Sequence, residues 1–228
     1  MNFMLKSSLN LYYHEPIKRM RLSTVELENY KKKLIMEYVL PAFGECQRDK
    51  EWVVNRIAGI CRLQQAVKCQ QMEVPGSHEN GYLWFSVSGI VHGYYYNNDR
   101  DMKTGTRIWK KREFIFDGSS LFHEEDRPDY IEALEPGEIL SISYAEMRKL
   151  MNELPGVEKH MRHLHVKTEH HYRHLNHLIN KPPLQRVKEF EQENPLFGAI
   201  ASNSTKAMHV GLTRQGYELQ LKRLKETK

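Results

Sequence analysis

Up to about residue 62, the chain places its hydrophobic residues at helical spacing. The stretch STVE at residues 23–26 is a capping box, with a hydroxyl at the N-cap and a glutamate three positions later. The apolar positions that follow it are Leu27, Tyr30, Leu34, Ile35 and Tyr38, before Pro41. A second amphipathic helix is marked by Trp52, Val53, Ile57, Ile60 and Cys61. The sequence therefore predicts a helical lead-in that packs on the next domain. Its first helix ends at Pro41.

From about residue 63 the hydrophobic period changes to the alternation typical of strands. YLWFS is rich in aromatic residues, SGIVHGYYYNNDRDMKTGTRIWKK has the pattern of two strands joined by the loop NNDRD, and REFIF is a further short strand. In YIEALEPGEILSIS two hydrophobic runs flank Pro136 and Gly137, which predicts a hairpin. Many short strands separated by turn signals predict an antiparallel sandwich or jelly roll.

After Ser143 the helical period returns, first in SYAEMRKLMNEL and then in a long helix from about Val157 to Asn180, where KPP ends it. Hydrophobic and small positions in this helix alternate in steps of four and three, which is a heptad seam. The seam consists of Val157, Met161, Leu164, Thr168, His171, Leu175 and Leu178. It predicts a two-stranded homodimer, and the alternative is a helix packed against its own β-domain.

The last segment has the pattern of three short helices, PLQRVKEFEQEN, STKAMHVG and TRQGYELQLKRLKE. Gly211 lies at the turn between the last two, and Thr213 is a candidate N-cap for the final helix. These features outline a helix-turn-helix.

Composition narrows the class of protein. The chain has 228 residues, 40% hydrophobic and 28% charged, which suits a globular protein with a core. No apolar run is long enough to cross a membrane, and no signal peptide is evident. Three cysteines without a CxxC pair predict a cytoplasmic location. The net charge of +5 comes largely from residues 181–228, where Lys and Arg outnumber Glu. A basic terminal domain suggests a polyanion partner, and a solvated helix end is the alternative.

The order of these parts resembles the Crp/Fnr family of bacterial transcription regulators. YLWFSVSGIVHGYYY is similar to the family's aromatic-rich strand, Ser-Gly turn and outgoing strand, and YIEALEPGEILSISYAEMRKLMNELP looks like its last hairpin and following helix. The resemblance spans residues 63–228. It implies an α+β fold with N-terminal helices, a cyclic-nucleotide-binding-like jelly roll, a long dimerisation helix and a C-terminal winged helix-turn-helix-like domain. The implied domain bounds are 1–155, 156–181 and 182–228.

The resemblance also implies where this chain departs from cyclic-nucleotide binders, which carry a Gly-Glu pair and an arginine in a phosphate cassette. The matching stretch is FDGSSLFHEEDRPDY, in which Ser119 follows Gly118 and Arg127 precedes Pro128. Asp129 would repel a phosphate, so we expect no response to cyclic AMP. A different small effector, or none, is expected instead. Any pocket is expected to be bordered by Gly118, Ser119, Ser120 and Tyr130, whose groups suit a neutral or weakly anionic ligand.

In the family the final helix reads DNA with Thr or Ser, Arg, Glu and a second Arg. In GLTRQGYELQLKRL, Thr213 and Arg214 match, Gln215 replaces the glutamate and Leu219 stands where the second arginine would be. Lys206, Lys222 and Arg223 are candidates for phosphate contacts. The leading hypothesis is a DNA-binding homodimeric regulator. The rival is a ligand-binding or protein-interaction module that has lost specific DNA binding, as Leu219 and Gly216 would suggest.

The stretch EHHYRHLNHLIN places His170, His174 and His177 on one helix face, while His171 lies in the seam. Two imidazoles of that face could share a metal, but no cysteine lies beside them, so we predict no metal and no cofactor. In a homodimer His171 would meet its mate, and stability would fall below about pH 6. No catalytic motif is present and we predict no enzyme. A cupin-like enzyme, a third class, would need a metal set inside the barrel, where only His92 and His123 are expected.

Overall fold

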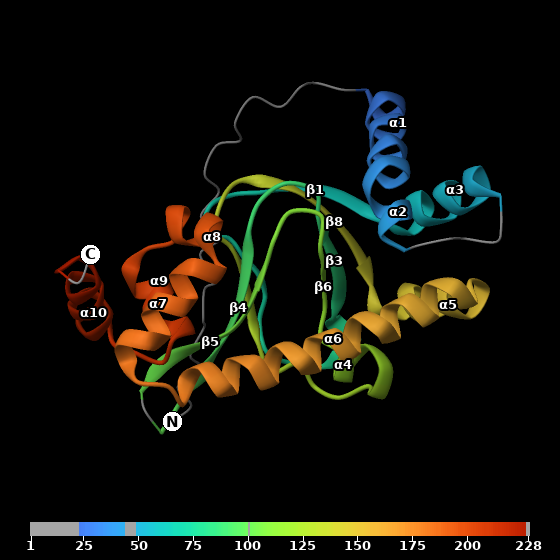
Figure 1. The fold of residues 1–228 in the computed structure, drawn as a ribbon. Coiled ribbons are helices and arrows are strands. Elements are labelled where there is room, and N and C mark those ends of the chain that lie inside the picture. The colour runs from blue at the N-terminus through green and yellow to red at the C-terminus, as the bar shows by residue number, and fades with distance from the viewer. Residues whose placement is uncertain (1–22, 44–48, 100, 227–228) are drawn as a thin grey trace, which may run out of the picture.

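Two antiparallel sheets form the centre of the fold, and helices gather at both ends of them (Figure 1). The computed structural model describes residues 23–43, 49–99 and 101–226. One sheet has the strand order β1 (Arg62–Ala66), β8 (Gly137–Ser143), β3 (Tyr82–Ser86) and β6 (Phe114–Ile115). The other has the order β2 (Gln71–Glu73), β7 (Tyr130–Ala133), β4 (Val91–Asn97) and β5 (Met102–Trp109). The expected jelly roll and the α+β class are both confirmed.

Hydrophobic side chains close the space between the two sheets. Trp84 and Ile139 from the first sheet meet Val91, Trp109 and Ile131 from the second in one buried cluster. Such filling follows from the period of two, because alternate residues of each strand point to the same face. The roll is thus a packed core of large side chains.

The hairpin expected around Pro136 and Gly137 is wrong in its pairing. Strand β7 pairs with β2 and β4, whereas β8 pairs with β1 and β3, so the two runs belong to opposite sheets. The crossing is tight at Gly137, where a Cβ atom would lie 1.7 Å from the Ser88 carbonyl oxygen. A glycine is required there, because the chain passes from one sheet to the other at this position.

The N-terminal lead-in packs on the first sheet, as expected. Helix α1 (Thr24–Leu34) begins with the predicted capping box, in which the Glu26 amide donates to the Ser23 hydroxyl oxygen at 3.3 Å. The helix continues through a π-helical turn, η1 (Ile35–Val39), and the short α2 (Leu40–Ala42), so it ends next to the predicted Pro41. Helix α3 (Lys50–Ile60) follows. Their apolar faces share one core with the first sheet and with helix α5 (Tyr144–Glu153).

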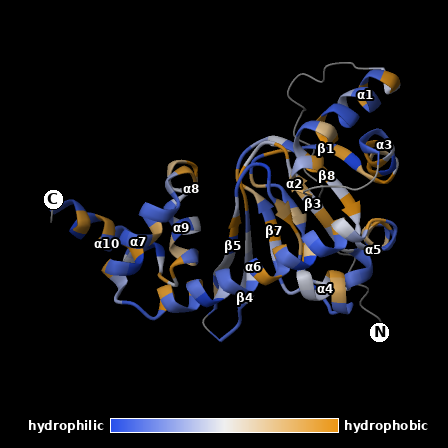
Figure 2. Cartoon of the chain, turned by 45° about the vertical axis from the view of Figure 1, so that its right-hand side comes forward, coloured by the Kyte–Doolittle hydropathy of each residue, from blue (hydrophilic) through white to orange (hydrophobic). Residues whose placement is uncertain are grey.

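The long helix α6 (Pro155–Ile179) runs along the roll from the α5 end to the C-terminal helices (Figures 1 and 2). Its heptad seam faces the interior of the same chain. Val157 and Met161 are fully buried in the core that holds the lead-in, and Leu164 packs partly against that core. Leu178 is buried among the C-terminal helices. The seam is therefore occupied within one chain, as the alternative hypothesis held, and it does not supply a free dimer surface.

The three remaining seam positions lie further along α6. The Thr168 hydroxyl receives a hydrogen bond from Arg107 on β5, and His171 Nε2 lies 3.3 Å from the Thr106 carbonyl oxygen. Leu175 is half-buried. His171 thus faces its own β-sheet, and the expected meeting of two His171 side chains across a dimer axis is corrected.

The C-terminal segment contains four helices among its described residues, where three were expected: α7 (Pro183–Glu193), α8 (Pro195–Ile200), α9 (Asn203–His209) and α10 (Arg214–Glu226). The additional helix is α8, six residues long. Residues 183–226 contain no strand, so the wing that the resemblance implied has no counterpart within that range. The four helices share a buried cluster with Ile90 and Leu134 of the roll, which joins the two parts of the molecule.

Among the described stretches 23–43, 49–99 and 101–226, none of the helices has the length and hydrophobicity needed to span a bilayer.

Candidate ligand and DNA-binding sites

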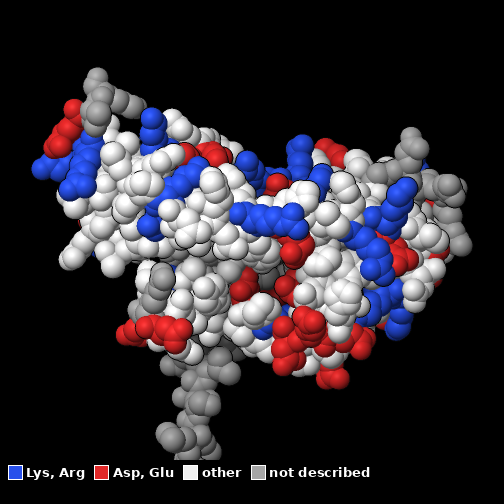
Figure 3. Space-filling model, turned by 60° about the horizontal axis from the view of Figure 1, so that its bottom comes forward, with Lys and Arg blue, Asp and Glu red and all other residues white. Residues whose placement is uncertain are grey.

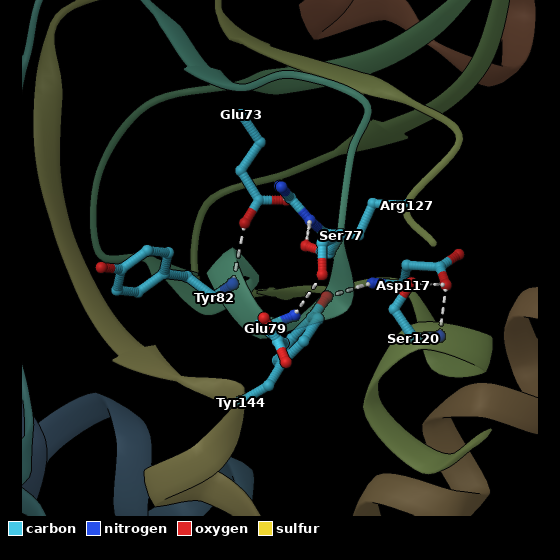
Figure 4. Close-up of polar contacts among 8 residues, drawn as sticks. All are labelled: Glu73, Ser77, Glu79, Tyr82, Asp117, Ser120, Arg127 and Tyr144. Carbon is cyan, nitrogen blue, oxygen red and sulfur yellow. Dashed lines mark hydrogen bonds and ion pairs between the residues drawn. The ribbon is translucent and has the colours of Figure 1, made fainter. Parts of the chain in front are cut away.

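The stretch FDGSSLFHEEDRPDY, compared above with a phosphate cassette, contains a buried arginine (Figure 4). Arg127 is 7% exposed, and its Nη1 lies 3.3 Å from Glu73 Oε2. Its Nε donates to the Ser77 carbonyl oxygen at 3.2 Å, and its backbone pairs with Gly76 in an isolated bridge. Arg127 therefore fastens this segment to the loop after β2. With its guanidinium engaged inside the protein, it does not present a cation to a bound phosphate.

The partner of Arg127 is equally enclosed. Glu73 is 6% exposed, and its Oε1 accepts a hydrogen bond from the Tyr82 amide at 2.8 Å. Burial raises the pKa of Glu73 above its usual range, and the Tyr82 amide and the Arg127 charge oppose that rise. A paired carboxylate in such surroundings is a structural element, because separating it from the guanidinium would leave a buried charge.

Beside this ion pair, a tyrosine bonds the residue that caps the short helix α4 (Gly118–His123). Tyr144 is fully buried, and its hydroxyl oxygen accepts a hydrogen bond from the Asp117 amide at 2.9 Å. The Asp117 carboxylate caps α4 by accepting from the Ser120 amide at 2.7 Å and from the Ser120 hydroxyl at 2.8 Å. Gly81 makes room for this arrangement, since a Cβ atom there would lie 2.3 Å from the Tyr144 ring.

Neighbouring groups cover the residues that were expected to border a ligand pocket. A Cβ atom on Gly118 would lie 2.0 Å from the imidazole of His165 on α6, so this imidazole covers the glycine. Ser120 is fully buried, and its carbonyl oxygen accepts from Arg148 at 2.9 Å. Ser119, between them on α4, is half-buried. The three positions belong to one helix, in which Gly118 contacts α6 and Ser120 contacts Arg148 on α5.

The fourth predicted pocket residue, Tyr130, lies on β7 and stacks on Tyr94 at 5.1 Å between ring centroids. Its neighbour Asp129 accepts a hydrogen bond from the Thr106 hydroxyl at 2.6 Å. Burial raises the pKa of Asp129. The hydrogen bond from Thr106 holds the Asp129 carboxyl against β5.

A hollow of about 840 Å³ lies between α7 and α10, far from the cassette. Its apolar lining comes from Leu184, Leu221 and Leu224, and charged residues including Lys188 and Glu189 surround it. Sequence reasoning missed this hollow, because it forms only when the two helices pack side by side.

The metal set of a cupin-like enzyme does not form. Among the described residues, no group of three His, Cys, Asp or Glu side chains could hold a metal ion. His92 was expected inside the barrel, but it is buried on the other side of its sheet, against the C-terminal helices. His123 is exposed at the end of α4. His174 pairs with Glu193 at 3.0 Å on the surface.

The expected helix-turn-helix is formed by α9 and α10. Gly211 in the turn has a φ of +63°, and a Cβ atom there would lie 3.0 Å from Ile179. Tyr217 is fully buried and anchors α10 against α7 and α9. The Thr213 hydroxyl oxygen accepts the Gly216 amide at 3.1 Å, which is the predicted N-cap. Helix α10 therefore presents its other face to solvent, on the side away from the roll (Figure 1).

Most predicted DNA contacts lie on that exposed face. Arg214, Glu218 and Lys222 follow at intervals of four and share one side of α10. Arg214 pairs with Glu218 at 2.8 Å and Lys222 with Glu226 at 3.9 Å. Exposed pairs of this kind are worth about 1 kcal/mol or less, so a phosphate can displace them. Thr213, Gln215 and Arg223 are also exposed, and Leu219 is 49% exposed between them.

Lys206 is the exception among these residues. It lies on α9 with 9% of its surface exposed, and its Nζ is 3.4 Å from Glu191 Oε1 on α7. The ion pair fastens the first helix of the motif to α7. The expectation that Lys206 meets a phosphate is therefore corrected. Figure 3 shows Lys and Arg side chains spread across this face of the molecule, including the C-terminal helices at the left, with acidic side chains gathered below the centre.

Comparisons with known proteins show which solved structures have a similar fold. No family model matches the sequence, and no curated protein matches it. The structure is similar to that of CLP, a c-di-GMP responsive global regulator from Xanthomonas campestris, with 17% identity, a TM-score of 0.65, and coverage of 78% of this chain and 93% of that one. It is also similar to FixK2 from Bradyrhizobium japonicum, with 14% identity, a TM-score of 0.62, and coverage of 74% and 86%.

A third similar structure is a Crp/Fnr family transcriptional regulator from Eubacterium rectale, with 14% identity and a TM-score of 0.65. The match covers 79% of this chain and 85% of that one. This chain therefore has the fold of the Crp/Fnr transcription regulators.

Proposed function

We propose that the chain is a divergent Crp/Fnr-like transcription regulator that binds DNA through α9 and α10. One observation carries the proposal: α10 is held by its buried Tyr217 so that Arg214, Gln215 and Lys222 project from the exposed face of the motif's second helix. A helix presented in this way fits the major groove, where an arginine can bond the guanine edge and a lysine the phosphates.

The proposal includes a homodimer, because a helix-turn-helix of this kind reads two half-sites about one helical turn, or about 34 Å, apart. The seam of α6 is occupied within the chain, so a dimer through α6 would use its outward side. That side carries His163, Val166, His170, Arg173 and His177, and Val166 is 51% exposed.

Replacing Arg214 with glutamine is expected to weaken binding to the preferred DNA site by about 1–3 kcal/mol and to relax the preference at one base pair in each half-site. Lys222→Gln should weaken binding to all sequences alike and reduce its salt dependence. Lys68→Gln, on an exposed turn of the roll, is the matched control and should change neither property. Fluorescence anisotropy with selected genomic fragments measures all three. Footprinting of the same fragments that shows protection of a single half-site would contradict the dimer.

A protein-interaction module is the rival function, and the exposed Leu219 on the same face of α10 favours it. Major-groove recognition has little use for a leucine at the centre of the reading face, whereas a protein partner would bury it. Salt-sensitive DNA binding with no sequence preference would support this rival over the regulator.

Cyclic AMP is expected to give no heat of binding in calorimetry, even at millimolar nucleotide. The physical reason is that Arg127 is paired with Glu73, His165 covers Gly118 and the half-buried Asp129 would face the phosphate. Cyclic di-GMP and a neutral nucleoside serve as comparison ligands. Micromolar affinity for cyclic AMP would overturn this part of the proposal.

A further inference from the structure

Two buried histidines meet where the C-terminal helices contact the roll. His92 on β4 is 1% exposed and His209 at the end of α9 is 3% exposed. His92 Nδ1 lies 3.2 Å from His209 Nε2, within hydrogen-bond distance. The two residues are 117 positions apart in the chain. This contact therefore joins the sheet to the first helix of the helix-turn-helix.

Aromatic and backbone groups enclose His209 on its other sides. Its ring stacks on Phe190 at 6.1 Å and meets the edge of Phe197 at 5.2 Å. The ring also lies against β5 at Gly105, where a Cβ atom would be 2.3 Å from His209 Nδ1. Any side chain at position 105 would push the imidazole away. The glycine therefore allows α9 to dock closely on the strand.

The number of protons that the pair can hold is limited by its geometry. Two neutral imidazoles share one hydrogen bond, because one nitrogen donates and the other accepts. One added proton preserves that bond. A second proton leaves two N–H groups facing each other at the 3.2 Å contact, with two positive charges enclosed by apolar rings.

The charged groups around the pair come from every element packed against it. Glu132 on β7 has its Oε1 3.8 Å from His92 Nε2, and that nitrogen has no hydrogen-bond partner. Glu132 can balance one positive charge but not two. On the α6 side stand His171 and His174, with Arg107 on β5 and Glu193 at the end of α7. On the α9 side Lys206 is already paired with Glu191.

We infer that His92 and His209 form a proton-sensitive latch that keeps the C-terminal helices docked on the β4–β5 sheet and releases them on acidification. Burial, followed by the nearness of His92 and His171, holds the pKa of His209 well below its usual range. Burial and then Arg107 lower the pKa of His171, which acts in the same direction.

The sign of the pH effect follows from these directions. The pKa of His209 is lower in the docked state than in the released state. At acidic pH the released state therefore binds a proton that the docked state does not bind. The docked state is therefore most stable above the ordinary histidine pKa of about 6.5, and its stability decreases as the pH falls below that value. The latch does not depend on DNA binding, so a test of the latch can succeed or fail independently of the proposed function.

Small-angle X-ray scattering and hydrogen exchange of the full chain, between about pH 7.5 and about pH 5.5, test the latch on both sides of the ordinary histidine pKa. In the wild type we expect the molecule to expand as the pH falls. The protection factors of the α9 amides, which correct for the intrinsic pH dependence of exchange, should fall by about tenfold per pH unit for one proton taken up. Tryptophan fluorescence should show that the roll stays folded. A wild type that remains compact until the roll itself unfolds would overturn the latch.

Two substitutions separate the latch from other histidines. His209→Gln keeps a donor and an acceptor but cannot be protonated, so its C-terminal helices should stay docked at the lower pH. His170→Gln removes an exposed imidazole of α6 and should open like the wild type. If His209→Gln fails to fold, His92→Gln replaces it. Opening of the folded glutamine variant at the same pH as the wild type would contradict the inference.

Discussion

Replacing Arg127 with leucine is expected to lower the free energy of unfolding by about 3–5 kcal/mol, because it leaves Glu73 buried without its partner. Both side chains are almost fully enclosed, at 7% and 6% exposure. The leucine also removes the hydrogen bond to the Ser77 carbonyl oxygen, which holds the loop after β2 in place. Urea denaturation followed by circular dichroism measures the loss.

The control for this prediction is the double variant Glu73→Gln with Arg127→Leu. Removing the buried charge together with its partner should recover much of the lost stability, since a neutral amide can still accept the Tyr82 amide. If the double variant is as unstable as Arg127→Leu alone, the defect arises from packing and not from an unpaired charge.

The loss of stability caused by Arg127→Leu should also become smaller as the pH is lowered. Without the guanidinium, the folded-state pKa of Glu73 rises further above its unfolded value, since burial already raises it. The folded variant then binds a proton that the unfolded chain does not bind. Its free energy of unfolding, relative to the wild type, should therefore increase as the pH falls through that raised pKa. A difference that is constant with pH would contradict the charge mechanism.

The sequence carries information on strands but little on which strands pair. Runs rich in aromatic and β-branched residues, bounded by turn signals, correctly located β3, β4, β5 and β6. The same rule cannot distinguish a hairpin from a corner between two sheets. At Gly137 the deciding contact is with Ser88, nearly fifty residues earlier, and local pattern does not contain it.

The heptad seam of α6 shows a related limit. Its period correctly indicated one buried face, but a period does not identify what covers that face. Here the cover is the chain's own roll and C-terminal helices, with Met161 in one core and Leu178 in another. A similar ambiguity affected Lys206, which looked like a surface cation and is paired with Glu191 inside the domain.

The contact of His92 with His209 has no local signature at all. Each is a single histidine in an otherwise ordinary strand or helix, and only the docking of α9 on β5 brings them together. By contrast, the N-cap Thr213 and the turn Gly211 were predicted, because caps and positive-φ turns depend on neighbouring residues.

Replacing Phe197 with alanine is expected to lower the free energy of unfolding by about 3–5 kcal/mol, the range measured for buried phenylalanines. Phe197 lies on α8, the helix that was missed in the sequence, and is 2% exposed. Its ring meets Phe190 edge-on at 5.7 Å and His209 at 5.2 Å. The cluster that contains it also includes Ile90 and Leu134 of the roll, so the cavity would form where the two parts join.

The neighbouring Leu196 offers a matched control for this change. It lies on the same short helix but is 63% exposed, so Leu196→Ala should alter the free energy of unfolding by no more than about 0.5 kcal/mol. Urea denaturation at about pH 7.5, above the ordinary histidine pKa, keeps the imidazole contact uncharged during the measurement. Equal losses for the two variants would mean that α8 is not docked on the roll, and the buried cluster would have to be withdrawn.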